Sequence, residues 1–169
     1  MHLLTDPPAW PATVGHYPFE EVTSTLDVAR EQAGQYPNAT WFTARRQTAS
    51  RGRRGRAWVA PEGNFYGTLT LPCPDPEAAS LRSFVAALAL NDALRAVMGE
   101  GPALALKWPN DVLLNDGKVA GILLESLTVG SRFWGVAVGI GVNLALAPAM
   151  AQVEDGAVYP VSVKGESGV

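Results

Sequence analysis

Arginine and glycine alternate between Gln47 and Trp58, and this segment has the residue types of an anion-binding loop. Six of the 13 basic residues lie between Arg45 and Arg56, although the formal net charge of the chain is −3. Guanidinium groups bind phosphate or carboxylate bidentately, and glycine lets the backbone approach a ligand closely. The plane of Trp58 could lie against a ring or a cation. The segment predicts an anion site, and the alternative interpretation is a solvated basic loop.

Two of the three lysines begin further candidate segments. Lys107 opens the run Lys-Trp-Pro-Asn-Asp, in which Asn110 and Asp111 can offer oxygens to a turn, a metal or a ligand. Lys118 opens an apolar run that contains Gly121. A lysine there can place a point charge against a carboxylate or phosphate, and a glycine within a strand permits close approach. The alternative interpretations are an ordinary Pro-Asn-Asp turn and a β-bulge.

A third segment carries two glycines at strand spacing. Gly139 and Gly141 leave one face of a strand bare, where something flat could lie, although such glycines also serve simple packing. Asn143 follows them and has both a donor and an acceptor, which suits the edge of a nucleobase. Glu125, at the end of the Lys118 run, is a candidate partner for a basic group or a solvated edge residue.

The totals of the chain exclude several classes of protein. Its 169 residues, 47% hydrophobic and 17% charged, suit one domain over 1–169. It has no run of about 18 apolar residues and no secretory signal, so we predict a cytoplasmic protein with no membrane partner. Cys73 is the single cysteine, and His2 and His16 are the two histidines. A disulfide, a metal cluster of these residues and a histidine triad are therefore not expected.

Hydrophobic periodicity predicts an α+β domain with a mixed, largely antiparallel sheet packed against helices. The expected helices are 26–33 and a largely buried 78–98. The expected strands are 40–44, 64–71, 103–108, 112–114, 119–127 and 133–143, with a hairpin turn at Asp116-Gly117. We expect residues 1–20 to form a Pro-rich surface leader, and 145–169 an irregular, truncated tail.

Together these segments resemble the catalytic domain of biotin protein ligases, in the biotin/lipoate protein ligase superfamily. The similarity runs from about Val22 to Leu144, and the motifs keep the family's order and spacing. They are Ser24-Thr25, Gln47 with the Arg51–Arg56 loop and Trp58, Lys107–Asp111, Lys118–Glu125 and Gly139–Asn143. The resemblance implies a fold similar to class II aminoacyl-tRNA synthetases. It also implies activation of biotin by ATP and Mg²⁺ to biotinyl-5′-AMP, and transfer to a lysine of a biotin carboxyl carrier protein.

The resemblance further implies a role for each matching residue. The ureido end of biotin would be lined by Ser24, Thr25 and Gln47, and Gly121 would admit its rings. The biotin carboxylate and the α-phosphate of ATP would meet Arg51 and Lys118. The loop over the adenylate would contain Arg53 and Arg54, and ATP phosphate would lie at Arg56. The adenine would lie at Trp58 and Asn143. The metal ion would lie near the phosphates at Asp111, and Asn110 would support the turn that carries Asp111. The catalytic candidates are Lys118, Arg51 and Arg53. No side-chain nucleophile is implied, because the two substrates supply the reacting groups.

Two residues and the chain length depart from the family pattern. Leu26 stands where the family usually has asparagine, and Ser50 where glycine precedes Arg51. If that position needs a positive φ, serine costs about 1 kcal/mol or more. A small C-terminal β-domain is also missing from the sequence. These departures favour an alternative, a ligase-like protein with altered or lost activity that binds a biotin- or lipoyl-type acid or a nucleotide.

A more distant alternative is a nucleic-acid-binding module that uses the Arg/Gly loop. The net charge of −3 argues against a broad basic face, so no nucleic-acid partner is expected. The sequence leaves open a homodimer and the identity of the carrier protein.

Overall fold

Seven strands form one sheet in the computed structural model, which describes residues 10–154 and 156–168. The strands are β1 (Gly15–Val22), β2 (Thr40–Gln47), β3 (Phe65–Pro72), β4 (Leu104–Lys107), β5 (Asp111–Leu114), β6 (Gly117–Val129) and β7 (Arg132–Val142). Their order across the sheet is β1-β2-β3-β7-β6-β5-β4. β1 and β2 are parallel, and every other neighbouring pair is antiparallel. The predicted α+β class with a mixed, largely antiparallel sheet is confirmed.

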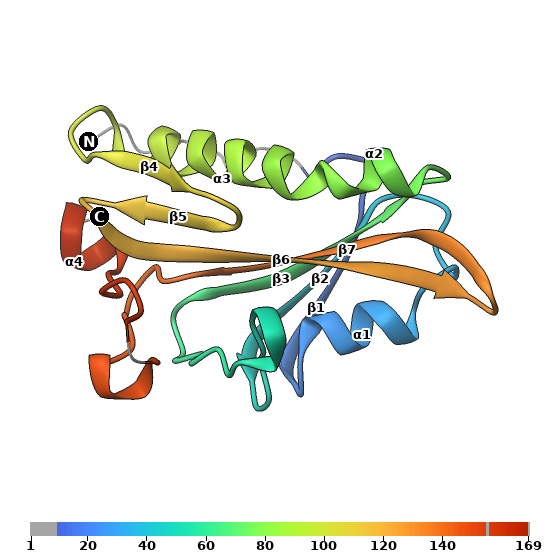
Figure 1. The fold of residues 1–169 in the computed structure, drawn as a ribbon, viewed down its shortest axis with the longest axis horizontal. Helices are drawn as coiled ribbons and strands as arrows, with labels where there is room; N and C mark the ends of the chain where they lie inside the picture. Colours follow the sequence, from blue (N-terminus) through green and yellow to red (C-terminus); the bar gives the residue numbers. More distant parts are fainter. Residues whose placement is uncertain (1–9, 155, 169) are drawn as a thin grey trace.

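Helices cover both faces of the sheet (Figure 1). One face carries α1 (Thr25–Glu31), and the other carries α2 (Pro76–Ser80) and α3 (Arg82–Met98). The alternation of β7 explains the two layers, because Val136 and Val138 pack in the cluster that includes Ala87 of α3, whereas Ala137 packs in the cluster of α1. No helix in the described part of the chain is long and apolar enough to cross a membrane.

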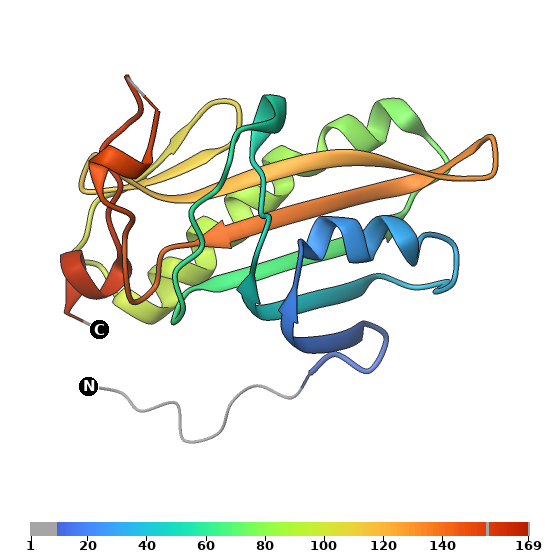
Figure 2. The ribbon, with the colours of Figure 1, turned by 90° about the horizontal axis from the view of Figure 1, so that it is seen from below.

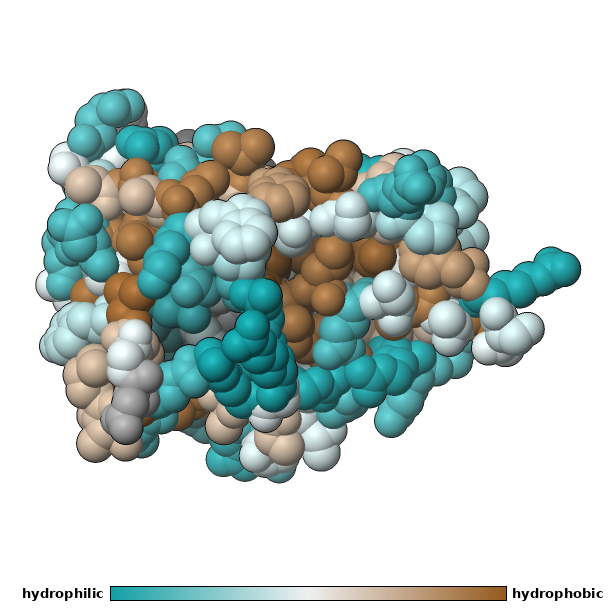
Figure 3. Space-filling model, in the orientation of Figure 1, coloured by the Kyte–Doolittle hydropathy of each residue, from teal (hydrophilic) through white to brown (hydrophobic). Residues whose placement is uncertain are grey.

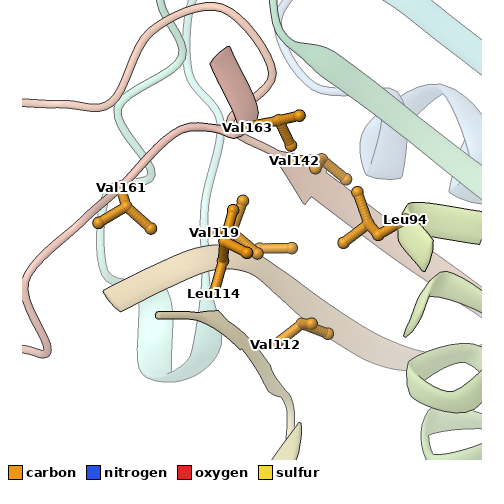
Figure 4. Close-up of a cluster of buried hydrophobic side chains, with 8 residues drawn as sticks. Leu94, Val112, Leu114, Val119, Val142, Val161 and Val163 are labelled. Carbon is orange, nitrogen blue, oxygen red and sulfur yellow. The ribbon is translucent and has the colours of Figure 1, made fainter. Parts of the chain in front are cut away.

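The tail after β7 is docked onto the end of the sheet. It contains a short 3₁₀ turn, η2 (Met150–Gln152), and a last helix, α4 (Val163–Ser167). Val161 and Val163 insert into a buried cluster made with side chains of α3, β5, β6 and β7 (Figure 4). A Cβ on Gly117 would lie only 2.2 Å from a methyl carbon of Val161, so glycine permits this approach. The predicted tail is irregular over most of its length, but it is packed and hydrogen-bonded.

Two local predictions need correction. Residues 15–20 of the predicted leader belong to the edge strand β1, which the prolines at 11 and 18 obscured. Residues 1–9 of the predicted leader lie outside the described part of the chain. The hairpin between β5 and β6 turns at Asn115-Asp116, one residue before the predicted pair. Both residues have positive φ, 48° and 67°, as a type I′ turn requires, and asparagine and aspartate tolerate that region well.

The expected buried helix 78–98 is also different. It divides at Leu81 into α2 and α3, and only Ala87 and Leu94 of α3 are buried. Phe84, Val85, Leu88 and Val97 are exposed, and hydrophobic side chains form a band along the top of the molecule in Figure 3. Apolar residues occur all round this helix, so periodicity alone could not show which face is covered.

Candidate functional site

A cavity of about 660 Å³ opens on the α1 face of the sheet. The Arg/Gly loop, with the short turn η1 (Arg53–Gly55), lies beside α1 on one side and the tail on the other (Figures 1 and 2). Strands β6 and β7 form the floor, and residues of the tail within 148–154 and 156–160 supply one wall. The cavity is lined by every residue that the sequence proposed for the site: Ser24, Thr25, Gln47, Arg51, Arg53, Arg54, Arg56, Trp58, Asn110, Asp111, Lys118, Gly121 and Asn143. Segments separated by more than a hundred residues are therefore brought to one place.

The floor is made flat by glycines on adjacent strands. Gly121 of β6 and Gly141 of β7 are directly paired, and the indole of Trp58 lies on both. A Cβ on either glycine would come within 2.9 Å of ring atoms, so no larger residue fits without displacing the indole. Trp58 Nε1 is buried and has no hydrogen-bond partner. The flat group on the bare face is thus the protein's own tryptophan, whose buried N–H donor is left unpaired against the floor.

The start of α1 forms the polar end of the cavity. Ser24 caps the helix, since its Oγ accepts from the backbone N–H of Leu26 at 3.2 Å. Gln47 Oε1 accepts from the backbone N–H of Thr25 at 2.8 Å and from its hydroxyl at 3.2 Å. Thr68 on β3 donates its hydroxyl to Thr25 Oγ1 at 2.8 Å. A buried hydrogen-bond network therefore fixes the hydroxyls and the amide that line this end.

The two departures from the family pattern have structural explanations. Leu26 is buried against Gly139, where a Cβ would lie 3.0 Å from the leucine side chain, and it belongs to the core cluster of α1. Ser50 does not have a positive φ, so the expected strain is absent. Its hydroxyl donates instead to the carbonyl of Trp58 at 2.6 Å and closes the base of the loop.

Lys118 lies where the floor meets the tail. Its Nζ forms an ion pair with Asp111 Oδ1 at 2.8 Å and sits 5.4 Å from the ring centroid of Trp58. The Lys118 and Asp111 side chains are only 26% and 17% exposed. Asn110 anchors the preceding turn, because its Nδ2 donates to the carbonyl of Ile122 at 3.1 Å. A cation and a carboxylate are thus held side by side at the cavity wall.

The loop arginines contact acceptors of the protein itself. Arg51 meets Asp27 and Glu125, Arg53 donates to Asn110 Oδ1 at 3.3 Å, and Arg56 pairs with Glu154. Arg54 has a positive φ of 57° inside η1. Carboxylates thus neutralise part of the loop's positive charge, which does not favour a broad nucleic-acid-binding face.

Asn143 has a structural role that the sequence did not reveal. Its Nδ2 donates to the carbonyl of Val161 at 3.1 Å, and its backbone carbonyl accepts from Val163 at 2.9 Å. The tail also pairs with Lys118 through hydrogen bonds to the backbone of Tyr159 and Val161. Asn143 Oδ1 stays buried and without a partner. The asparagine therefore braces the tail against the end of β7.

Sequence reasoning missed the acidic partners of the loop and the whole tail wall. Asp27 and Arg30 showed no signal beyond ordinary helix-surface residues, and Glu154 lies in a segment without a motif. Glu125 was predicted as a partner for a basic group, and this is confirmed by its pairs with Arg30 and Arg51. An acidic residue on α1 facing a basic loop is recognisable only after the elements are placed in space.

Comparison with known proteins decides the family. The model of the biotin/lipoate A/B protein ligase family matches residues 17–143. The chain belongs to this family. It is 58% identical over 146 residues to a biotin–[acetyl-CoA-carboxylase] ligase of Paracoccus denitrificans, covering 86% of this chain and 61% of that protein. The chain thus spans about three fifths of the length of this relative.

Solved structures of biotin protein ligases have the same fold. The enzyme of Leishmania major in complex with biotinyl-5-AMP superimposes with a TM-score of 0.73 at 33% identity, over 92% of this chain and 64% of that one. The ligase of Aquifex aeolicus in complex with biotin and ATP gives 0.72 at 28% identity, over 92% and 62%. The predicted fold and the predicted family resemblance are both confirmed.

Proposed function

We propose that this protein activates biotin with ATP to biotinyl-5′-AMP and transfers the biotinyl group to a lysine of a biotin carboxyl carrier protein in the cytoplasm. The observation that carries the proposal is the convergence of Arg51 and Lys118 with Ser24, Thr25 and Gln47 on one cavity. Membership of the biotin/lipoate ligase family and the 58% identity to a biotin ligase support it. Oligomeric state is a separate question that size-exclusion chromatography with light scattering would answer.

In the first step a carboxylate oxygen of biotin forms a bond to the α-phosphorus of ATP, and pyrophosphate leaves. In the second step the amine nitrogen of the carrier lysine attacks the acyl carbon, AMP leaves, and the amine loses a proton. The first step brings anions together, so Arg51 and Lys118 would offset the developing charge. No side chain of the protein acts as a nucleophile in either step.

The remaining residues would bind and enclose the substrates. Ser24, Thr25 and Gln47 would meet the ureido group. Arg56 would exchange Glu154 for ATP phosphate, and Arg53 and Arg54 would close over the adenylate to exclude water. The free Oδ1 of Asn143 could accept from the adenine amino group beside Trp58. Gly121 would let the Trp58 indole lie low on the floor, so that the substrate has room above the indole.

Magnesium fits this site only as an ion shared with the substrate. The described residues contain no group of three or more His, Cys, Asp or Glu side chains that could hold a metal. Asp111 is the carboxylate that lines the cavity wall beside Lys118. One carboxylate plus substrate phosphates is a usual Mg²⁺ environment, and the ion would supply charge neutralisation there.

The direct test is to incubate the protein with biotin, ATP and Mg²⁺, to measure pyrophosphate release, and to identify biotinyl-5′-AMP by mass spectrometry. Addition of a carrier domain should then give a mass increase on one lysine. Parallel reactions with lipoic and octanoic acids address the alternative of a changed acid substrate. Pyrophosphate release with one of those acids and none with biotin would reject biotin as the substrate. Acid binding without pyrophosphate release would indicate a ligase-like protein without activity.

A further inference from the structure

Behind Arg51, two carboxylates and a second arginine form a closed ring of ion pairs. Arg51 Nη1 donates to Asp27 Oδ1 at 2.7 Å, and Arg51 Nη2 approaches Glu125 Oε2 at 3.4 Å. Arg30 contacts the same two oxygens, Asp27 Oδ1 at 3.2 Å and Glu125 Oε2 at 2.6 Å. Positive and negative groups alternate around the ring, and their formal charges sum to zero.

The ring joins three separate parts of the fold. Asp27 and Arg30 lie on α1, Glu125 lies on β6, and Arg51 is the first arginine of the loop. Arg51 lines the cavity, whereas the other three residues do not. The ring is therefore behind the site, and it can act on a ligand only through Arg51.

Partial burial makes this ring a firmer support than the surface pairs of the protein. The side chains of Arg51, Asp27 and Glu125, on the cavity side of the ring, are 23%, 31% and 23% exposed, whereas Arg30, on the outer side, is 56% exposed. By contrast, Arg45 and Glu20 are 80% and 85% exposed and lie 3.6 Å apart. Exposed pairs of that kind contribute little, because water and salt screen them, whereas partly buried pairs are screened less.

The geometry of a guanidinium group turns this support into orientation. The group has five N–H donors in one rigid plane, and the two carboxylates take donors on Nη1 and Nη2. Fixing two of them fixes the direction of the others. Burial lowers the pKa of Arg51, but its hydrogen bonds to Asp27 and Glu125 raise it, and the net direction is upward. Arg51 therefore stays cationic.

We propose that Asp27 and Glu125 are positioning residues that hold Arg51 in the orientation in which it meets the carboxylate of the acid substrate. Arg30 holds the two carboxylates from the other side, so that they stay in place against Arg51 while its remaining donors meet the ligand. The inference rests on the proposed function, because it takes an organic acid as the ligand. It assigns a role in acid binding to residues that do not line the cavity.

The test is isothermal titration calorimetry with biotin and with biotinol, the neutral alcohol analogue. The variants are Asp27→Asn, Glu125→Gln and the double variant, which keep size and remove charge. We expect the double variant to bind biotin about tenfold more weakly, which is about 1.4 kcal/mol, and biotinol within twofold of the parent protein. Each single variant should weaken biotin binding about threefold. Glu20→Gln is the matched control, since it removes an exposed carboxylate from an arginine pair on β1 and β2.

Three outcomes would overturn the inference. Equal weakening of biotin and biotinol would mean that the carboxylates support the shape of the pocket rather than the charge of Arg51. Unchanged biotin affinity would mean that Arg51 needs no support, and tighter binding would mean that the ring competes with the ligand. If the parent protein binds neither compound, the proposed function itself fails. The melting temperature of each variant is measured as well, so that a change in affinity is not confused with unfolding of the variant.

Discussion

The glycine-bearing strands β6 and β7 and the arginine loop face the same cavity, but different forces hold them. The floor is built from paired backbone, buried valines and an indole pressed onto Gly121 and Gly141. The loop is held at its base by Ser50 and by the ring around Arg51, and at its tip by exposed contacts of Arg53 and Arg56. Backbone pairing and packing are insensitive to ligands, whereas charged partners can be exchanged for phosphate or carboxylate. The floor is therefore preformed, and the tip of the loop is the part that can rearrange.

Removal of the floor cation should have the largest effect. We expect Lys118→Ala to reduce pyrophosphate release about 10² to 10³-fold, because a positioned charge at the reacting phosphate is lost. The melting temperature should also fall, because the ion pair that is broken is largely buried and Asp111 loses its cation, so pyrophosphate release is measured well below the melting temperature of the variant. Pyrophosphate release measured against Lys164→Ala, a change of an exposed lysine on α4, provides the comparison. Persistence of activity would show that Lys118 serves only to pair with Asp111.

A change at the tip of the loop should alter containment rather than chemistry. Arg53→Gly removes the contact with Asn110, so the loop should close less well and release biotinyl-5′-AMP. We expect about tenfold more labelling of bystander lysines, measured by streptavidin blotting against added albumin, with pyrophosphate release reduced less than in Lys118→Ala. Arg53→Lys keeps the charge and should label albumin less. Strict carrier specificity in Arg53→Gly would show that this arginine does not enclose the adenylate.

Filling the floor should cost stability as well as binding. In Gly141→Ala the new Cβ would lie 2.9 Å from atoms of the Trp58 indole, which would have to move. Overpacking of this kind costs about 1 to 3 kcal/mol, measured by chemical denaturation, and nucleotide affinity should fall with it. Gly101→Ala is the control, because a Cβ there meets no atom within 4 Å. Unchanged stability of Gly141→Ala would mean that the floor adapts as readily as the loop.

The smallest expected effect is on stability and concerns Tyr66 of β3. Tyr66 lies beside the floor residue Gly141 in the sheet. Its buried hydroxyl donates to the carbonyl of Pro61 at 2.7 Å, so Tyr66→Phe should lose about 1 kcal/mol at pH 7. Burial raises the pKa of Tyr66 to about 12, so the folded protein keeps this proton above pH 10 while the unfolded chain releases it. The stability of the parent protein should therefore fall between pH 10 and 12, and the gap between parent and variant should close.

Chemical denaturation at pH 8 to 12 measures this effect, with Tyr159→Phe as the control at an exposed tyrosine. Parallel pH profiles of Tyr66→Phe and the parent protein would mean that the phenol titrates normally and that the floor is more open than its burial indicates.

Most of the sheet could be predicted because local signals agree there. Six of the seven strands and α1 follow from alternation, a capping serine and glycine stops, which act within a few residues. β1 was missed because its pairing with β2 is parallel and non-local, and Pro18 within it and Pro11 before it suggested a loop. The exposure of α3 was missed because its apolar residues occur on all sides of the helix. Their spacing therefore does not indicate which side packs against the sheet.

The sequence by itself determined the family, the fold class and a set of candidate site residues that all line the cavity, because each motif combines residue type with local spacing. Only the tertiary structure decided that Trp58 lies on the floor glycines, that Asn143 braces the tail, and that Asp27, Arg30 and Glu125 enclose Arg51. Apart from the Asp27–Arg30 pair within α1, each of these contacts joins residues far apart in the chain. Their distances depend on how the sheet, α1 and the tail pack together, and the pattern of any one segment does not contain that information.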